Sequence, residues 1–244
     1  MALFFMSNAD NYSVNLINNT MKRLVLPVLF AFLLPVSFSC STLKNYMLTE
    51  QDASAAIRQL LQIGAQSNMQ GAFTKENVMT TIFPEALRKT LNTLQQLGLT
   101  NEVDRFTTTM ASAAEQTATR SVPIFLSGIS RMSLTDAIRI VKNGGTSATD
   151  YLRTSVGTEL RQSINPVMKS ALDEYKLTEQ WEKIIKPARA LVGDRLNLDL
   201  ANLMAGMVSE KMFQKLAETE VQVRTNAAAR TTPLLQKVFS GNWK

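Results

Sequence analysis

The sequence predicts an all-α fold, with a single multi-helix globular domain that follows an N-terminal signal peptide. Apolar residues recur at spacings of three and four along most of the chain, which is the period of an amphipathic helix. Sustained alternation of apolar and polar residues, which is typical of paired strands, is missing. Hydrophobic residues form 45% of the 244 residues and charged residues 19%, so we expect a folded domain rather than a disordered chain.

Residues 21–39 have the order of a bacterial secretory signal. Met21-Lys22-Arg23 gives a basic start, and the apolar run from Leu24 to Phe38 is followed by small residues around Cys40. Residues 1–20 contain no basic residue, so we expect Met21 to be the true start and the preceding segment to be an over-extension. The apolar run is too short, and too often interrupted by proline, for a comfortable membrane span.

Cys40 is the only cysteine of the chain and stands where a bacterial lipoprotein carries its lipid-bearing cysteine. The preceding Ser37-Phe38-Ser39 departs from the usual lipobox at its first two positions. Its serines would also suit ordinary signal peptidase, and cleavage there would free a soluble protein. We expect lipidation at Cys40, a linker over residues 40–48 and a helical domain over residues 49–240. The domain is then anchored in the cell envelope, facing the periplasm or at the outer membrane.

Two helices are expected at the start of the domain. Thr49 can cap the first, which should end near Met69-Gln70-Gly71. Its apolar face comprises Ala53, Ala56, Ile57, Leu60, Leu61 and Gly64. Residues 73–83 are less periodic and are interpreted as a loop or a short helix. Pro84 suits the first position of the next helix, which Gly98 stops. The apolar face of that helix comprises Leu87, Leu91, Leu94 and Leu97.

The stretch from Val103 to Tyr151 is expected to be the packing centre. Thr100 or Asn101 can cap a helix there, and Pro123 should break or bend it. One face of this helix comprises Val103, Phe106, Met110, Ala113, Ala114, Thr117 and Ser121. The core residues expected after it are Ile124, Phe125, Leu126 and Ile129. We expect one core to contain Phe106, Met110, Ile124, Phe125, Ile138 and Leu152.

A turn of glycine, threonine and serine follows a short helix within the packing centre. Ser133 and Asp136 resemble the start box of that short helix, which Gly144 stops, and Thr146 or Ser147 starts another. The turn could hold a phosphate, because free backbone amides and the positive end of a helix dipole point there. A helix end followed directly by a helix start is the alternative. It is favoured because no Walker-type lysine follows the glycines.

Beyond the packing centre, the helical period continues in four runs. The first contains Leu160, Ile164, Val167, Met168, Ala171, Leu172 and Tyr175, and Pro166 should kink it. Thr178 starts the second, which contains Pro187 and the face Trp181, Ile184, Ile185 and Ala188. Asp199 caps a long third helix towards Gln222, with Leu200, Leu203, Met204, Met207, Val208 and Leu216. Thr232 caps the short last helix and Pro233 opens it.

Several short blocks, in their order along the chain, are similar to one known family. They are Met110 to Glu115, Val122 to Phe125, Met132 with Asp136-Ala137, Ala148-Thr149 with Tyr151, and the segment from Glu220 to Phe239. Together they resemble the uncharacterised bacterial family catalogued as domain of unknown function 4197, over roughly Thr49 to Phe239. The resemblance implies a helical, exported and often lipid-anchored protein, and it brings no established activity or catalytic residue. Ala227 stands where the family has a proline after Asn226.

The chain contains no histidine, which removes the commonest general base, the Ser-His and Cys-His pairs and every His-ligated metal site. No cofactor is expected. The predicted function is a non-enzymatic binding or interaction module of the envelope, and the alternative is a carboxylate- or Ser/Lys-dependent enzyme. Glu115, Asp136 and Asp150 are the carboxylates nearest the packing centre, but no motif joins them into a site.

Polar residues crowd the C-terminal tail. Arg224, Asn226, Arg230 and Thr231 could form an anion or partner site. Alternatively, the arginines pair with neighbouring carboxylates or helix ends and lock the last helix in place. From Lys211 onward the chain has six basic residues against two acidic ones, a charge that could rest on anionic lipid headgroups.

The partners expected are the membrane, through a lipid anchor at Cys40, and an envelope protein, lipid or wall component. Nucleic acid is not expected, because the signal directs the chain out of the cytoplasm. The sequence also has no basic stripe interleaved with aromatic residues.

Overall fold

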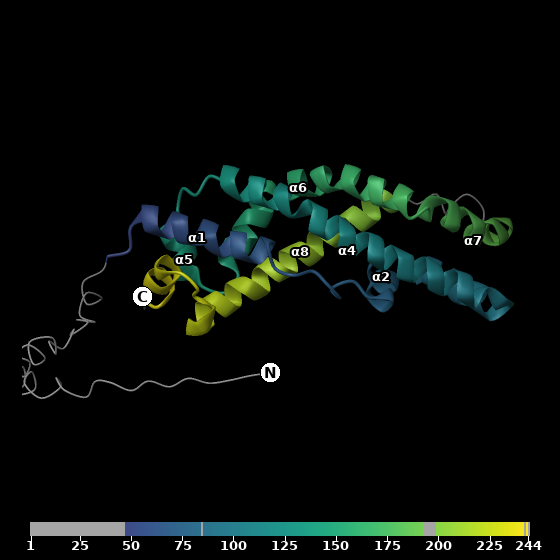
Figure 1. Ribbon diagram of the computed structural model, residues 1–244, viewed down its shortest axis with the longest axis horizontal. Helices are drawn as coiled ribbons and strands as arrows, with labels where there is room; N and C mark the ends of the chain where they lie inside the picture. Colours follow the sequence, from purple (N-terminus) through teal and green to yellow (C-terminus); the bar gives the residue numbers. More distant parts are fainter. Residues whose placement is uncertain (1–46, 84, 193–198, 242, 244) are drawn as a thin grey trace, which may run out of the picture. The chain divides into compact units, whose positions relative to one another are not determined.

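The computed structural model of the protein describes residues 47–83, 85–192, 199–241 and 243, with the side chains of residues 86 and 187–192 left aside (Figure 1). The predictions for the start of translation, the signal peptide, Cys40, nearly all of the linker and Pro84 lie outside these residues, and those for the side chains of Pro187 and Ala188 lie outside the described side chains. In the described part of the chain every regular element is helical, which confirms the all-α prediction.

The helices account for most of the domain. In chain order they are α1 (Glu50–Ala65), α2 (Lys75–Ile82), α3 (Glu85–Leu94), the π-helical η1 (Gln95–Leu99), α4 (Thr100–Arg131), α5 (Ala137–Asn143), α6 (Ser147–Glu174), α7 (Leu177–Val192), α8 (Leu200–Thr225), the 3₁₀ turn η3 (Ala227–Ala229) and α9 (Pro233–Phe239). None of the helices in the described ranges is both long and apolar enough to cross a membrane.

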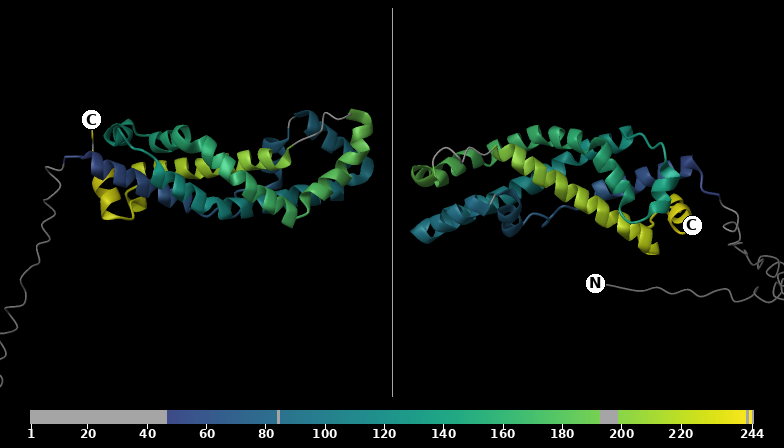
Figure 2. Two further views of the ribbon diagram at one scale, coloured as in Figure 1. Left: turned by 90° about the horizontal axis from the view of Figure 1, so that it is seen from above. Right: turned by 180° about the vertical axis from the view of Figure 1, so that it is seen from behind.

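Three long helices, α4, α6 and α8, pack against one another and carry the rest (Figures 1 and 2). Helices α1, α5 and α9 gather at one end of this set, where α1 also lies along α8. Helices α2 and α7 pack towards the other end, α2 on α4 and α8, and α7 on α4 and α6. Segments far apart in sequence are thus joined through the three long helices.

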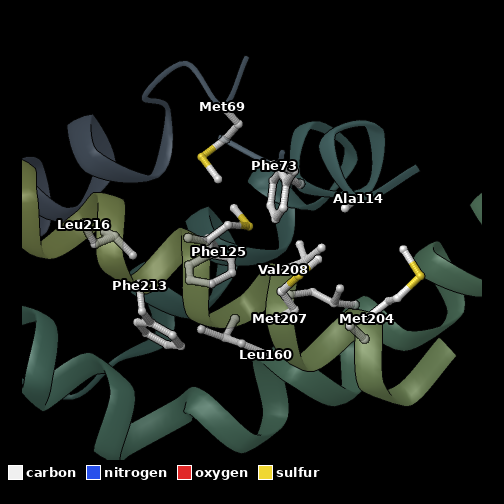
Figure 3. Packing of buried hydrophobic residues seen from close by; sticks show 14 of the residues in the cluster. Met69, Phe73, Ala114, Phe125, Leu160, Met204, Met207, Val208, Phe213 and Leu216 are labelled. Carbon is white, nitrogen blue, oxygen red and sulfur yellow. The ribbon is translucent and has the colours of Figure 1, made fainter. Parts of the chain in front are cut away.

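The predicted apolar face of α4 is confirmed, because its residues from Val103 to Ser121 are buried. Phe125 is fully buried, and its ring meets that of Phe213 edge to face, with centroids 5.2 Å apart (Figure 3). Phe106, Met110 and Leu152 are also buried. Three residues expected in the core lie only partly buried at its margin: Ile124, Leu126 and Ile138.

Three predicted helix caps are confirmed. The side-chain oxygens of Thr49, Asp199 and Thr232 each accept a hydrogen bond from the backbone amide three residues later, at 3.1, 2.9 and 3.2 Å. Such bonds satisfy amides that the first turn of a helix leaves without partners. Local sequence therefore sets the starts of α1, α8 and α9.

Two predicted helix starts are wrong, because distant groups or a continuous backbone take over the role of the cap. The chain runs from α3 through η1 into α4, so neither Thr100 nor Asn101 caps, and the Thr100 hydroxyl donates to the Gln95 carbonyl at 3.0 Å. The start box at Ser133 does not form. Instead, the Glu50 carboxylate of α1 accepts hydrogen bonds from the first amides of α5, those of Ala137 at 2.9 Å and Ile138 at 3.3 Å.

Other boundaries shift by a few residues. Helix α1 ends at Ala65 and not near Gly71, and just beyond this end the Ser67 amide donates to the Gly64 carbonyl at 3.2 Å in a tighter last turn. Helix α7 begins at Leu177, before Thr178, directly after Lys176 turns the chain with a positive φ of 52°. Helix α8 extends to Thr225, past the predicted end at Gln222.

Pro123 does not break α4. The helix continues to Arg131, and residues on both sides of the proline, Ser121 and Phe125, are buried. Burial on both sides offsets the hydrogen bond that a proline removes from a helix. Leu97 is 70% exposed and is not part of the leucine face, because Gly98 turns the backbone there with φ 99°.

Helix α1 binds groups from distant parts of the chain. The Arg58 guanidinium donates to the Ile129 and Met132 carbonyls at the end of α4, at 2.5 and 2.6 Å. From the last helix region, Thr232 donates to the Gln59 side chain at 2.8 Å and Lys237 pairs with Asp52 at 3.2 Å. The first helix of the domain is thereby tied to its last.

Candidate functional site

The turn at Gly144 to Ser147 places the N-terminus of α6 against α8. The carboxylate of Glu220, which is fully buried, accepts hydrogen bonds from the backbone amides of Ala148 and Thr149 at 2.9 and 2.8 Å. The Thr149 hydroxyl donates to the same group at 2.7 Å. The turn is a helix end at Gly144 followed by a helix start at Thr146, which is the interpretation that the sequence favours, and the positive end of α6 binds an internal carboxylate.

Arg224, one turn further along α8, completes this cluster. Its Nε and Nη2 atoms donate to one oxygen of Glu220 at 3.0 and 2.8 Å. Its remaining partners are the carbonyl oxygens of Val141 and Ile140 at 2.9 and 3.1 Å and the hydroxyl of Ser147 at 3.1 Å. The guanidinium also lies 5.2 Å from the centre of the Phe239 ring. Arg224 thus joins α5, α6, α8 and α9, and only 9% of its side chain is exposed.

Arg230, Asn226 and Thr231 lie beside this cluster and also bond within the chain. The guanidinium of Arg230 donates to the carbonyls of Val223 and Arg224 at the end of α8, both at 2.9 Å. The Asn226 side chain accepts from the Ala228 amide at 3.0 Å and starts η3, with Ala227 in place of proline. The Thr231 amide donates to the Ala229 carbonyl at 3.1 Å. These contacts are those of the locking alternative.

The other basic residues of the tail are also engaged wherever the structure describes them. Lys211 donates to the Gln214 side chain at 3.0 Å, and Lys215 pairs with Glu218 at 2.8 Å. Lys237 pairs with Asp52 of α1. The positive charge of the tail is therefore largely balanced or bonded within the fold.

The three carboxylates considered for catalysis lie apart, on α4, just before α5 and on α6. Glu115 on α4 accepts from the Gly71 amide at 3.2 Å, Asp136 pairs with Arg139 at 2.8 Å, and Asp150 accepts from the Thr146 hydroxyl at 2.9 Å. Among the residues that the structure describes, no three Asp, Glu, His or Cys side chains are grouped so that they could hold a metal ion.

Comparison with protein families bears on this helical arrangement. Residues 47–240 match the model of a family described as protein of unknown function (DUF4197). The chain belongs to the DUF4197 family. Comparison with curated proteins and with solved structures gives no match. The fold and contacts of this DUF4197 protein are thus the main guide to its function.

Sequence reasoning missed a groove between α6 and α8. One part of it, about 440 Å³, is lined by Arg153, Gly157, Arg161, Gly206, Glu210 and Phe213, among others. It shares Thr158 and Arg161 with a second hollow of about 580 Å³. The signal was present in the sequence as a spacing of four, because Arg153, Gly157, Arg161, Asn165 and Lys169 follow one line along α6. Nothing in that spacing shows which face of α8 it meets.

Proposed function

We propose that this DUF4197 protein is exported, lipid-anchored at Cys40, and acts in the cell envelope as a non-enzymatic binding module. The observation that carries the proposal is the position of the only cysteine. It lies directly after a secretory signal pattern and nine residues before Thr49, the cap of α1. Nine residues reach at most about 30 Å when fully extended, so the domain would be held close to the membrane.

The distribution of the carboxylates supports binding over catalysis. An acid–base enzyme brings its groups to one place, within reach of the same substrate atoms. Here Glu115, Asp136 and Asp150 belong to different parts of the fold, and each is held by its own partner. The partners of the module belong to the envelope and are a protein, a lipid or a wall component.

The intact mass of the protein extracted from membranes tests the anchor. We expect an N-terminus at Cys40 that carries diacylglycerol, whose two acyl chains are enough for stable anchoring. Replacing the cysteine, Cys40→Ala, should release the protein from membranes without changing its melting temperature, because the residue precedes the helical domain. An unmodified N-terminus at any other residue, as ordinary signal peptidase would leave, contradicts the proposal.

A further inference from the structure

Helices α6 and α8 run antiparallel, and residues of α6 face residues of α8 in successive pairs along the two helices. In one of these pairs, Arg153 of α6 donates through Nη1 to both carboxylate oxygens of Glu210 on α8, at 2.6 Å to Oε1. The same guanidinium lies 4.6 Å from the centre of the Phe213 ring. The charge of Arg153 is therefore balanced from α8.

Further along α6, Arg161 faces a glycine of α8, Gly206. Arg161 lies two turns beyond Arg153, and Gly206 one turn before Glu210. A Cβ atom added to Gly206 would lie 3.1 Å from Cζ and Nη2 of Arg161, so the guanidinium rests on bare helix backbone. Within the described ranges, no hydrogen bond or ion pair engages it. Arg161 therefore has no carboxylate opposite it among the described residues of α8, whereas Arg153 has Glu210.

The surroundings of Arg161 suit an anion. The second hollow is lined by two cations, a hydroxyl and three amides, without a carboxylate: Arg161, Lys169, Thr158, Gln162, Asn165 and Asn202, together with Pro166. Lys169 lies two turns beyond Arg161, about 12 Å along the helix axis, and both are long enough to reach the space between them. An anion placed there would meet two positive charges and several neutral donors.

We propose that this pocket binds a phosphate group, which takes the place of the missing carboxylate beside Arg161. A phosphate offers several acceptor oxygens to the planar fork of an arginine, to the point charge of a lysine and to the surrounding amides. The phosphate can belong to a soluble ester or to a lipid headgroup, which present the same chemistry. The pocket thus gives the proposed binding module a ligand class, phosphate-containing molecules. Only the biological role of the pocket rests on the proposed function, because the pocket itself does not depend on the anchor at Cys40.

The test is a calorimetric titration of the purified full chain in a neutral detergent. Three probes are used: inorganic phosphate, glycerol 1-phosphate and short-chain phosphatidylglycerol dissolved in the same detergent. Arg161→Gln should weaken binding about tenfold or more, the scale of a lost charge-assisted hydrogen bond. Arg105→Gln, at an exposed arginine of α4 outside the pocket, is the matched control and should bind like the wild type.

A second variant keeps Arg161 and supplies the missing partner from the protein. Gly206→Glu should weaken phosphate binding to a similar degree, because its carboxylate pairs with Arg161 as Glu210 pairs with Arg153. Its melting temperature should not fall, since the guanidinium is the end of a flexible side chain and glutamate favours a helix more than glycine does.

The outcomes distinguish a soluble phosphate ester from a lipid headgroup, and they test the phosphate site separately from the lipid anchor. Binding of glycerol 1-phosphate that depends on Arg161 indicates a soluble ester, and binding of phosphatidylglycerol alone that depends on Arg161 indicates a headgroup. The site is overturned if the wild type binds none of the probes, or if Arg161→Gln and Arg105→Gln behave alike. These results are independent of the mass at Cys40, so failure of the site and failure of the anchor are distinguishable.

Discussion

The buried cluster of Glu220 and Arg224 predicts a large loss of stability for Glu220→Ala. The carboxylate accepts five hydrogen bonds, from Ala148, twice from Thr149 and twice from Arg224. Its removal leaves two helix amides without an acceptor and a guanidinium, only 9% exposed, without its counter-charge. Breaking one side of a buried pair costs about 3–5 kcal/mol.

Thermal unfolding followed by far-ultraviolet circular dichroism measures this loss. For a domain of this size, the expected cost lowers the melting temperature by about 6–20 °C. Glu218→Ala is the matched control, because that carboxylate is half exposed and pairs with Lys215 at the surface. Its loss should cost no more than about 1 kcal/mol.

A companion variant isolates the uncompensated charge. Adding Arg224→Met to Glu220→Ala should recover part of the lost stability, since the guanidinium no longer lies buried without a counter-charge. If Glu220→Ala melts like Glu218→Ala, the cluster does not hold α6 to α8 in the way the contacts indicate, and the reasoning is refuted.

Two further predictions concern the long helices. Phe125→Ala should lower the free energy of unfolding by about 3–5 kcal/mol in urea denaturation, because the fully buried ring leaves a cavity against Phe213; a loss below about 1 kcal/mol would contradict this packing. Hydrogen bonds from the Arg120 guanidinium hold the pKa of the Glu174 carboxyl below its ordinary value, so this pair stabilises the fold at neutral pH and the contribution is lost as the pH falls through the lowered pKa. Arg120→Gln should raise the pKa of Glu174 in a nuclear magnetic resonance titration. An unchanged pKa would show that Arg120 does not stabilise the ionised form of Glu174.

Much of the fold follows from local sequence. The period of apolar residues places the buried faces of α1, α4 and α6, and side chains at Thr49, Asp199 and Thr232 set helix starts, because these signals act within one or two turns. The failures occur where a distant group replaces a local one. Glu50 of α1 takes the role expected of Ser133, and no local pattern could show that the two segments meet.

The candidate sites show the same division. For the turn before α6, the sequence offers a phosphate site and favours a helix end followed by a helix start. For the crowded arginines of the tail, it offers a lock or a binding site. That one carboxylate, Glu220, joins the two features could not be predicted, because its partners Ala148 and Thr149 belong to a distant part of the sequence. Arg161 likewise becomes distinctive only when α8 presents Gly206 to it.

The contacts of α1 imply that this helix is synthesised early and gains its tertiary contacts late. Chains are synthesised from the N-terminus, so α1 is complete before any of its partners exists. Its apolar face is covered by α8, Arg58 finds its carbonyls at the end of α4, and Gln59 is bonded by Thr232 near the C-terminus. Helix α1, the first helix in the described part of the chain, is therefore among the last to be secured. A chain interrupted before α8 would leave exposed the part of the apolar face of α1 that α8 covers, and a chaperone or a protease could recognise the unfinished protein there.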